Sequence, residues 1–299
     1  MGDTMRWADG LIAVDWGTSN RRAYLLDASG SCVDEHEDSQ GILSVPAGGF
    51  PAAIAEIRQR LGDQPLLLAG MIGSNRGWVE APYVPCPAAI DDLAAALVRP
   101  SDREAIVPGV SYVGEGRADV MRGEEVQLLG AVADETIPPD ALVCHPGTHN
   151  KWARVARGRI AEFRTVMTGE LFNLLKEHSI LADLLQPDVE PDDGAFRTGV
   201  DHGLTHDDIP AELFAVRART LLGQAPHSSP ASFTSGLLIG ADLRIGLAGT
   251  VPAEVVVMGR PELTELYAAA LAQAGIQARE LDGERCFLAG IKAIAERIE

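Results

Sequence analysis

This sequence lacks the segments that direct a protein to a membrane or out of the cell. The apolar run at residues 11–14 ends at Asp15, too early for the apolar core of a signal peptide. No stretch approaches the roughly 20 apolar residues that a membrane-spanning helix needs. Cysteine is scarce and no Cys-x-x-Cys pair occurs, which argues against a zinc site or a disulfide framework. We therefore expect a cytoplasmic protein with buried free thiols at Cys32, Cys86, Cys144 and Cys286.

Basic residues are few compared with acidic ones. The chain has 43 Asp and Glu against 25 Lys and Arg, a formal net charge of −18. Such a surface repels nucleic acids and anionic membranes, so we expect neither as a partner. It also repels ATP and any carboxylated substrate, so a site for these ligands needs local cations or magnesium. Arginine and lysine residues inside glycine-rich segments are therefore the interesting ones.

The length and composition are those of a two-domain globular protein. The chain has 299 residues, of which 46% are apolar and 23% charged. A chain of this length usually divides into two domains, each with its own hydrophobic core. An active site forms most easily between two domains. The proline-containing loop at residues 134–140 suggests the boundary. We predict an N-terminal lobe over residues 1–135 and a C-terminal lobe over 136–299, with the terminal helix 285–299 a candidate for the lobe interface.

Local patterns predict alternating strands and helices. The chain opens with a three-stranded meander, and a later buried strand leads into the glycine-rich loop Gly70–Trp78, a place where α/β proteins hold ligands. Predicted strands cover residues 11–15, 22–26, 31–36, 65–69, 141–144, 159–166, 254–258 and 276–281. Predicted helical segments cover residues 50–61, 119–133, 168–185, 210–222, 232–247, 262–274 and 285–298.

One short motif occurs twice, 130 residues apart. VDWGTSNRRA aligns with CHPGTHNKWA, and each copy is followed by a predicted strand, turn and strand. The matched pairs are Gly17 with Gly147, Thr18 with Thr148, Asn20 with Asn150, Arg21 with Lys151 and Ala23 with Ala153. The repetition indicates two structurally similar lobes, each opening with a Gly-Thr hairpin.

A Gly-Thr hairpin is suited to hold phosphate. Its turn presents backbone N–H groups and a hydroxyl, and glycine lets the backbone approach a phosphate closely. Two facing hairpins can clamp a triphosphate. Asp15 precedes the first turn, and its carboxylate suits magnesium, which prefers hard oxygen ligands. The alternative is that Asp15 only caps a turn.

These motifs resemble those of a known superfamily. VDWGTSNRR and PGTHNKW resemble the two phosphate motifs of actin-like ATPases and sugar kinases, and VVVMG with the following helix resembles their adenosine motif. GMIGSNRGW, MRGEEVQLLGA, PGTHNKW with MTGELF, and SGLLIGADL together resemble the 2-dehydro-3-deoxygalactonokinase family over nearly the whole chain. The resemblance implies an α/β fold with two ribonuclease-H-like lobes, an active-site cleft between them, and ATP and Mg²⁺ as cofactors.

The resemblance also implies a reaction. Members phosphorylate the 6-hydroxyl of 2-dehydro-3-deoxy-D-galactonate with ATP, giving 2-dehydro-3-deoxy-6-phosphogalactonate and ADP in galactonate catabolism. The alternatives are a kinase of this architecture for another sugar or sugar acid, and a non-kinase ATPase. The chain has no room for the large peptide-binding domain of chaperone ATPases. Besides ATP and the sugar acid, a homo-oligomeric partner stays open.

The family comparison suggests a catalytic base. In glycerol- and xylulose-type kinases a Gly-Asp pair begins the helix before the second phosphate hairpin, and the aspartate deprotonates the acceptor. Gly123-Glu124 occupies the matching place, so Glu124 is the candidate, with Glu125 as the alternative. A third reading is that both only stabilise the helix dipole. One departure is His145-Pro146, where the wider superfamily often has an acidic residue.

The remaining site residues lie in the quoted motifs. A planar arginine fork suits the carboxylate of a sugar acid, so Arg76 is the first candidate and Arg122 the second. Trp78 either stacks on the carbon chain or belongs to the core. Candidate substrate-binding residues are Ser74, Asn75, Arg76, Trp78 and Arg122, and candidate cofactor-binding residues are Gly17, Thr18, Asn20, Gly147, Thr148, Lys151, Gly236 and Gly259, with Asp15 as the metal ligand.

Overall fold

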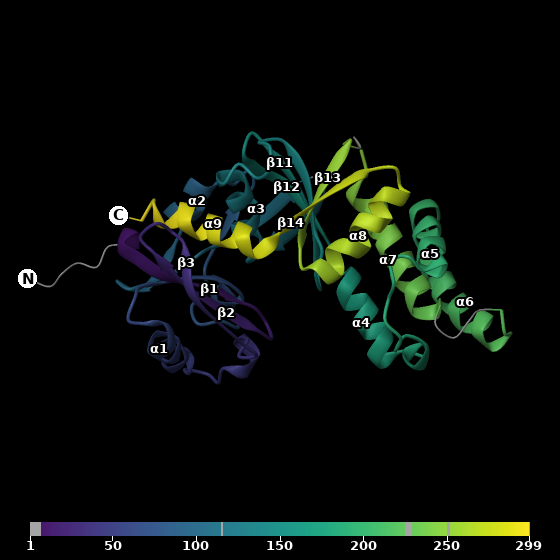
Figure 1. The fold of residues 1–299 in the computed structure, drawn as a ribbon, viewed down its shortest axis with the longest axis horizontal. Coiled ribbons are helices and arrows are strands. Elements are labelled where there is room, and N and C mark those ends of the chain that lie inside the picture. The colour runs from purple at the N-terminus through teal and green to yellow at the C-terminus, as the bar shows by residue number, and fades with distance from the viewer. Residues whose placement is uncertain (1–6, 115, 225–228, 250–251, 299) are drawn as a thin grey trace, which may run out of the picture. The chain divides into compact units, whose positions relative to one another are not determined.

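The structure is a computed structural model that describes residues 7–114, 116–224, 229–249 and 252–298 (Figure 1). The chain forms two compact units. Unit 1 contains the described residues up to Asp140, together with Arg154–Phe163 and the segment from Gly283 onward. Unit 2 contains Ala141–Ala153 and Arg164–Asp282. The lobes expected from the sequence, 1–135 and 136–299, stay a prediction.

Unit 1 is built on a six-stranded sheet with the order β3-β2-β1-β4-β7-β6. Its strands are β1 (Gly10–Trp16), β2 (Arg21–Asp27), β3 (Cys32–Asp38), β4 (Leu66–Gly70), β6 (Val98–Ser101) and β7 (Glu104–Ile106). β1 pairs antiparallel with β2 and parallel with β4, which pairs parallel with β7. β4 is buried along its whole length, as its uninterrupted apolar sequence requires of a central parallel strand.

Helices cover this sheet. α1 (Phe50–Leu61) buries one apolar face against β1 and β4, as its spacing predicts. α3 (Glu124–Ala133) packs on α9 (Gly283–Ala295), and glycine permits the close approach: a Cβ at Gly130 would overlap the Cys286 carbonyl oxygen. The short helices of unit 1 are η1 (Trp7–Asp9), η2 (Ile42–Ser44), η3 (Met71–Gly73) and α2 (Ile90–Ala95), and its small second sheet holds β5 (Tyr83–Pro85), β8 (Gly109–Gly114) and β9 (Arg117–Met121) in the order β5-β8-β9.

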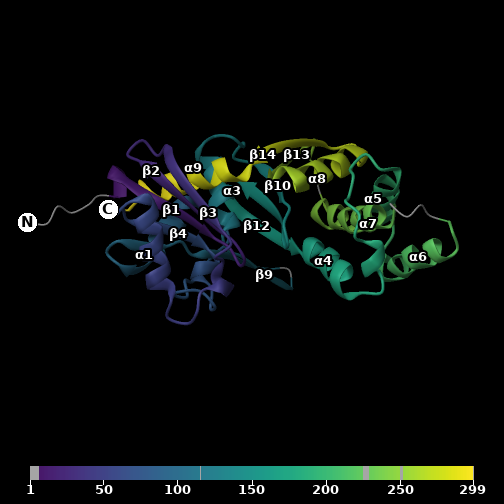
Figure 2. The ribbon, with the colours of Figure 1, turned by 60° about the horizontal axis from the view of Figure 1, so that its bottom comes forward.

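Unit 2 contains most of a five-stranded sheet with the order β12-β11-β10-β13-β14. The strands are β10 (Ala141–His145), β11 (Asn150–Ala156), β12 (Arg159–Val166), β13 (Glu254–Gly259) and β14 (Gln277–Asp282). The helices are α4 (Thr168–His178), η4 (Ala182–Leu184), α5 (Gly194–Thr205), α6 (Ile209–Leu221), α7 (Ser229–Gly246) and α8 (Pro261–Gln273) (Figure 2). β10 pairs parallel with β13, and β13 pairs parallel with β14.

The two sheets repeat one topology. In each, a three-stranded meander is followed by two parallel strands added on the side of the first strand: β3-β2-β1-β4-β7 in one and β12-β11-β10-β13-β14 in the other. This agreement confirms the predicted α/β fold with a repeated sheet. It also places the two Gly-Thr turns at equivalent points, between the first and second strand of each meander.

Several local expectations were wrong. The helix expected over 119–133 starts only at Glu124, because Gly123 adopts φ 110° and Asp119–Met121 pairs with β8 as strand β9. The helix expected over 168–185 ends at His178. Helix α5 (Gly194–Thr205) was not predicted from the sequence. Cys32 is exposed and Cys86 half-buried, so only Cys144 and Cys286 are the buried thiols expected.

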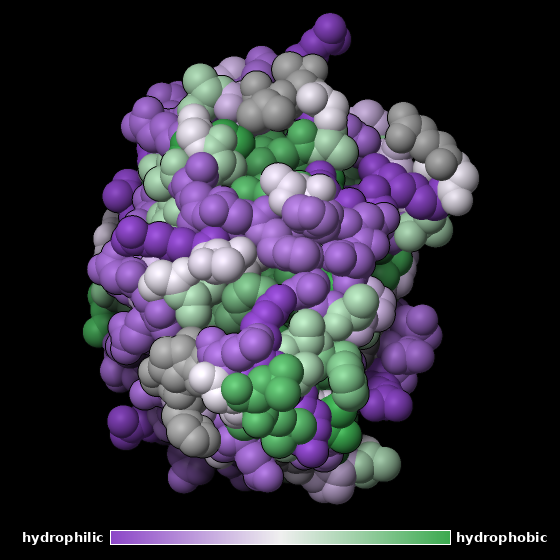
Figure 3. Space-filling view, turned by 90° about the vertical axis from the view of Figure 1, so that its right-hand side faces the viewer, coloured by the Kyte–Doolittle hydropathy of each residue, from purple (hydrophilic) through white to green (hydrophobic). Residues whose placement is uncertain are grey.

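Unit 2 exposes several large apolar side chains, and Figure 3 shows apolar surface among hydrophilic residues on the face it views. These side chains belong to α4, to α6 and to residues next to these helices: Met167, Leu171, Leu174, Ile180, Phe214, Leu221 and Leu222. Among the described residues, none of the helices has the length and hydrophobicity needed to span a lipid bilayer.

Candidate active site

The first Gly-Thr hairpin connects β1 to β2. Gly17 N–H donates to the Asn20 carbonyl oxygen at 2.9 Å and closes the turn. A neighbouring segment holds the turn from outside, because Gly41 N–H donates to the Ser19 carbonyl oxygen and Ile42 N–H to that of Gly17, both at 3.0 Å. The side chains of Thr18 and Asn20 remain exposed. The turn is thus fixed by its backbone, while its predicted ligand-binding side chains face solvent.

Asp15 lies where three elements of unit 1 converge. It stands opposite Arg22 in the β1–β2 pair, and its side chain is half-buried. A Cβ at Gly70 would lie 3.5 Å from Asp15 Oδ1, and a Cβ at Gly123 would lie 3.3 Å from Gly70 Cα. The carboxyl ends of β1 and β4 therefore meet the start of α3. Asp15 and the candidate base at position 124 belong to one neighbourhood of the fold.

The two glutamates at the start of α3 lie in different environments. Glu125 is fully buried, and both of its carboxylate oxygens accept from Gly123 N–H, at 2.9 and 2.7 Å. Burial raises the pKa of Glu125 to about 8, and the neighbouring Glu124 carboxylate adds to the increase. Glu124 is only half-buried and accepts from Arg122 N–H at 3.1 Å. The less enclosed carboxylate is thus that of Glu124.

The glycine-rich loop after β4 presents two exposed polar side chains. Asn75 and Arg76 are exposed, whereas Ser74 is buried and its hydroxyl accepts from Arg76 N–H at 3.3 Å. Trp78 is half-buried and packs against the core of unit 1, which favours the core reading of this residue. Of the predicted sugar-acid contacts in this loop, Asn75 and Arg76 are therefore the accessible ones.

Arg122 lies against the same loop. Its Nη2 donates to the Ala81 carbonyl oxygen at 2.8 Å, and its guanidinium lies over the Tyr83 ring, 4.4 Å from the centroid. A Cβ at Gly73 would come within 2.9 Å of Arg122 Nη1. Nε and Nη1 are buried and find no hydrogen-bond partner in the part of the chain that the structure describes. Arg122 is therefore a cation with unused donors beside the predicted substrate loop.

The second Gly-Thr hairpin connects β10 to β11 and is closed by a side chain. Gly147 N–H donates to Asn150 Oδ1 at 2.7 Å, and Asn150 is buried, with 1% of its surface exposed. The first turn of α4 lies on the hairpin, because Glu170 N–H donates to the Thr148 carbonyl oxygen at 2.9 Å. Lys151 is 4% exposed, and its Nζ donates to the His149 carbonyl oxygen at 3.4 Å.

A pocket of about 310 Å³ opens beside this hairpin, within unit 2. Its size falls in the range of small-molecule sites. Its lining combines hydroxyl and amide groups with apolar walls and comprises Gly147, Thr148, Asn150, Thr168, Gly169, Phe172, Asn173, Val189, Ser235, Leu238, Ile239, Leu263, Leu266 and Tyr267. The pocket thus joins the second phosphate motif to the SGLLIGADL segment.

The two other predicted glycines of unit 2 differ in their surroundings. Gly259 ends β13, and a Cβ there would lie 3.5 Å from the Pro146 carbonyl oxygen, an ordinary contact distance. Gly236 packs on α5, and a Cβ there would overlap the Phe196 carbonyl oxygen. Close packing of α7 on α5 therefore accounts for Gly236 without a ligand, and its role toward the cofactor stays a prediction.

One polar residue that the sequence analysis missed lies beneath this pocket. Asp242, on α7, is 1% exposed. Its carboxylate accepts from Trp152 Nε1 and Thr168 Oγ1, each at 2.8 Å, and from two further donors, Asn150 Nδ2 and Tyr267 Oη. Burial raises the pKa of Asp242, and these donors act against the increase. The available signal was a single charge inside the apolar run SGLLIGADL.

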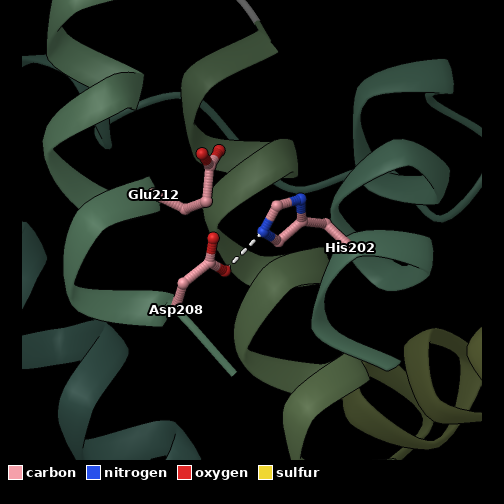
Figure 4. Close-up of side chains that lie close together, drawn as sticks. All are labelled: His202, Asp208 and Glu212. Atoms are coloured by element: carbon pink, nitrogen blue, oxygen red, sulfur yellow. Dashed lines mark hydrogen bonds and ion pairs between the residues drawn. The ribbon is translucent and has the colours of Figure 1, made fainter. Parts of the chain in front are cut away.

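A separate group of potential metal ligands lies between α5 and α6 (Figure 4). His202 Nε2 and Asp208 Oδ1 are 2.7 Å apart, and Glu212 pairs with Arg219 at 2.6 Å. The three candidate ligand atoms lie within 4.8 Å of one another. None of the three residues lines the pocket beside the second hairpin. Two ion pairs account for this arrangement.

The repeated sheet with a Gly-Thr hairpin in each copy is the arrangement that defines the class of actin-like ATPases and sugar kinases. A protein-family model described as 2-keto-3-deoxy-galactonokinase matches residues 15–294. The 2-dehydro-3-deoxygalactonokinase of Escherichia coli K12 is 36% identical over 291 residues, covering 96% of this chain and 98% of that protein. The chain belongs to the 2-keto-3-deoxy-galactonokinase family and is therefore a phosphotransferase.

Solved structures agree with this fold. A crystal structure from Sinorhizobium meliloti, assigned as a 2-dehydro-3-deoxygalactonokinase, superposes with a TM-score of 0.90 at 33% identity and covers 96% of this chain and 99% of that one. Component A of (R)-2-hydroxyglutaryl-CoA dehydratase from Acidaminococcus fermentans superposes with a TM-score of 0.51 at 13% identity, over 97% of this chain and 99% of that one. The second similarity concerns the fold alone, because that protein is named for a different activity.

Proposed function

We propose that this chain transfers the γ-phosphate of ATP to the 6-hydroxyl of 2-dehydro-3-deoxy-D-galactonate, in galactonate catabolism. The observation that carries the proposal is the pair of Gly-Thr hairpins at equivalent points of two sheets with the same strand order, in a chain of the 2-keto-3-deoxy-galactonokinase family. A cytoplasmic location and the absence of nucleic-acid and membrane partners belong to the same proposal.

The nucleotide fits the pocket of unit 2. Gly147 and Thr148 offer a turn that a phosphate can approach closely, and apolar side chains of α7 and α8 offer walls for a base. Gly259 at the end of β13 leaves room at the adjoining strand end. In the first hairpin, Thr18 and Asn20 are exposed and offer further donors to phosphate. Lys151 is the candidate cation of the second motif.

Magnesium fits Asp15. A carboxylate at the end of β1, half-buried beside the Gly70 backbone, supplies the hard oxygen ligand that this ion prefers. When bound, the ion neutralises charge on the transferring phosphoryl group. Asp15 would hold it through its carboxylate, which belongs to the residue opposite Arg22 in the β1–β2 pair.

The sugar acid fits the loop after β4. Arg76 is exposed and therefore accessible to a carboxylate, and Arg122 has buried guanidinium nitrogens without a partner among the residues described. An anion nearby would accept hydrogen bonds from these Arg122 donors. Asn75, which is exposed, is the accessible candidate for a hydroxyl contact. A carboxylated acceptor therefore suits this loop better than a neutral sugar does.

Glu124 is the proposed base. A base must reach the acceptor hydroxyl, and Glu124 is the less enclosed of the two carboxylates at the start of α3. Glu125 directs both oxygens to Gly123 N–H and fixes the helix start instead. Phosphoryl transfer depends mainly on positioning and charge neutralisation, and the base accepts the proton as the bond to phosphorus forms.

A coupled ADP assay with a panel of 2-keto-3-deoxy sugar acids tests the proposal. We expect ADP release that depends on the acceptor and is fastest with 2-dehydro-3-deoxy-D-galactonate. A neutral sugar of the same length serves as the control. Equal ADP release with and without every acceptor would contradict a kinase and indicate a plain ATPase, while a preference for another epimer would move the substrate assignment.

A further inference from the structure

The hydrogen bonds around Asp242 run in a continuous path to the turn of the second hairpin. The Asn150 amide donates to Asp242 and to Tyr267 Oη, and its Oδ1 accepts from Gly147 N–H at 2.7 Å. An asparagine side chain can present either its oxygen or its nitrogen to a neighbour. A carboxylate is an acceptor only, so Asp242 decides which way the amide lies. The Asn150 oxygen is thereby left for Gly147 N–H.

The same carboxylate ties together the elements that surround the pocket. Its donors come from β11 (Trp152), from the first residue of α4 (Thr168) and from α8 (Tyr267), while Asp242 itself is on α7. The α4 start is in turn seated on the hairpin, since a Cβ at Gly169 would overlap the Gly147 carbonyl oxygen. A change at Asp242 therefore reaches the phosphate turn by two routes, through Asn150 and through α4.

Burying the charge of Asp242 lowers the stability of the fold. Asp242 is 1% exposed, and an ionised carboxylate in the interior loses its hydration. Uncharged residues of similar volume often replace buried charges at little or no cost in stability. The network requires an acceptor, because the Trp152 indole and the Asn150 amide point N–H groups at the carboxylate. Because burying the Asp242 carboxylate lowers stability, we infer that its contribution is to orient the donor groups around it and not to stabilise the fold.

We propose that Asp242 is a positioning residue for phosphoryl transfer, which orients Asn150 so that the Gly147-Thr148 turn is held ready to bind the phosphates of ATP. The inference rests on the proposed function, in which this turn binds nucleotide. Asp242 touches neither nucleotide nor acceptor in this account. Asp242 acts on the turn through Asn150, and on the start of α4 through Thr168.

The test measures the Kd of Mg·ATP by calorimetry, together with Tm and the KM of the sugar acid, on the full chain. In Asp242→Asn we expect a Kd raised on the order of 10-fold or more, because small displacements at a binding group cost that much. We expect Tm within a few degrees of the wild type and an unchanged KM for the sugar acid. Thr234→Val is the matched control, since Thr234 is fully buried on the same helix and its hydroxyl has no partner among the described residues.

A swapped pair sharpens the test. Asn150→Asp alone places two carboxylates together and should also weaken nucleotide binding, whereas Asp242→Asn with Asn150→Asp restores one amide–carboxylate pair and keeps an acceptor for Gly147 N–H. Recovery of the Kd to within about threefold in the double variant supports positioning. Wild-type Kd values in both single variants, or a lowered Tm as the sole change, would overturn it.

Two further outcomes are separable. If Asp242→Asn does not fold, Trp152→Phe removes one donor to the carboxylate outside the pocket lining: a raised Kd supports the inference and a wild-type Kd overturns it. If the wild type binds Mg·ATP but does not phosphorylate a sugar acid, the proposed substrate fails, and the ratio of variant to wild-type Kd still decides on Asp242.

Discussion

In the first Gly-Thr hairpin the turn is closed by a backbone carbonyl, whereas in the second it is closed by a side chain. Gly17 N–H donates to the Asn20 carbonyl oxygen, and Gly147 N–H donates to the Asn150 side-chain oxygen. Asn20 is exposed and Asn150 is buried. Two asparagines at matching positions of a repeat therefore have different tasks: Asn20 is available to a ligand, and Asn150 carries the turn.

The aligned cations, Arg21 and Lys151, are both buried but have different partners. Arg21 is 2% exposed, pairs with Asp38 at 2.6 Å and lies over the Trp16 ring. It therefore forms a structural ion pair within unit 1. Lys151 is also buried, with Nζ near the His149 carbonyl oxygen of its own turn. Sequence alignment of a repeat thus predicts where the backbone goes better than it predicts what each side chain does.

The largest expected effect concerns a residue that belongs to unit 1 and has no counterpart in the second motif. Glu124→Gln keeps size and hydrogen bonding but removes the proton acceptor, so kcat should fall by roughly 10²–10⁴. The Kd of ATP should not change, because the hairpins bind the phosphates. Glu125→Gln is the parallel control. A dead Glu125→Gln with a nearly normal Glu124→Gln would mean that the base is the neighbour.

The next effect concerns the proposed magnesium ligand Asp15, which lies beside the first hairpin. Asp15→Asn should keep the fold and lose most magnesium-dependent turnover, on the order of 10²-fold, because an amide is a poorer ligand than a carboxylate. A magnesium titration of the initial rate measures it. Asp34→Asn, on the exposed strand β3 of the same sheet, should leave the titration as it is. Unchanged turnover in Asp15→Asn would remove this residue from the site.

The two arginines beside the substrate loop give a third contrast. Arg76→Ala should raise the KM of the sugar acid roughly 10- to 100-fold while the KM of ATP stays the same, because loss of a charged hydrogen bond costs roughly 1.5–3 kcal/mol. Arg122→Ala is measured alongside. If Arg76→Ala leaves both KM values unchanged and Arg122→Ala raises that of the acid, the half-buried arginine holds the carboxylate.

The two asparagines test the comparison directly. Asn150→Ala leaves buried donors and acceptors without partners, so it should lower the free energy of unfolding by about 1–3 kcal/mol. Asn20→Ala changes an exposed side chain and should stay within about 0.5 kcal/mol of the wild type. Denaturant unfolding of both variants measures the difference. Equal losses would show that the turns are held alike after all.

The last effect is a pH dependence of the stability of unit 1. The pKa of Glu125 is raised to about 8, so the stability that its neutral form contributes is present below its ordinary pKa and is lost as pH rises toward 8. Glu125→Gln should therefore gain Tm relative to the wild type as pH increases from about 5 to 8, by roughly 2–4 °C for each kcal/mol, and level off above that. A difference that is constant over this range would contradict the shift.

Local patterns predicted much of the fold. The apolar spacing of Phe50–Leu61 gave α1 its observed bounds, and the repeated motif indicated two similar sheets. α5 was missed because Gly199 and Gly203 lower its helix propensity. Those glycines are needed by packing: a Cβ at either would overlap the backbone of α7. Packing against a distant segment cannot be read from local propensity.

The candidate site was predictable where a motif is contiguous. Gly17-Thr18, Gly147-Thr148 and Gly123-Glu124 could be found from the sequence because each is a short run with a backbone role. The role of Asp242 could not be predicted from the sequence, since its partners lie 25 to 92 residues away along the chain. Its importance depends on burial and on four donors that converge only in the folded unit.

The central claim is that this chain phosphorylates the 6-hydroxyl of a 2-keto-3-deoxy sugar acid. The most direct measurement is phosphorus NMR with proton coupling on the product formed from 2-dehydro-3-deoxy-D-galactonate and ATP. The account predicts a single phosphomonoester whose phosphorus couples to the two protons on carbon 6, with one ADP per product. Phosphate at another carbon, or ADP with inorganic phosphate and unmodified acid, would contradict it.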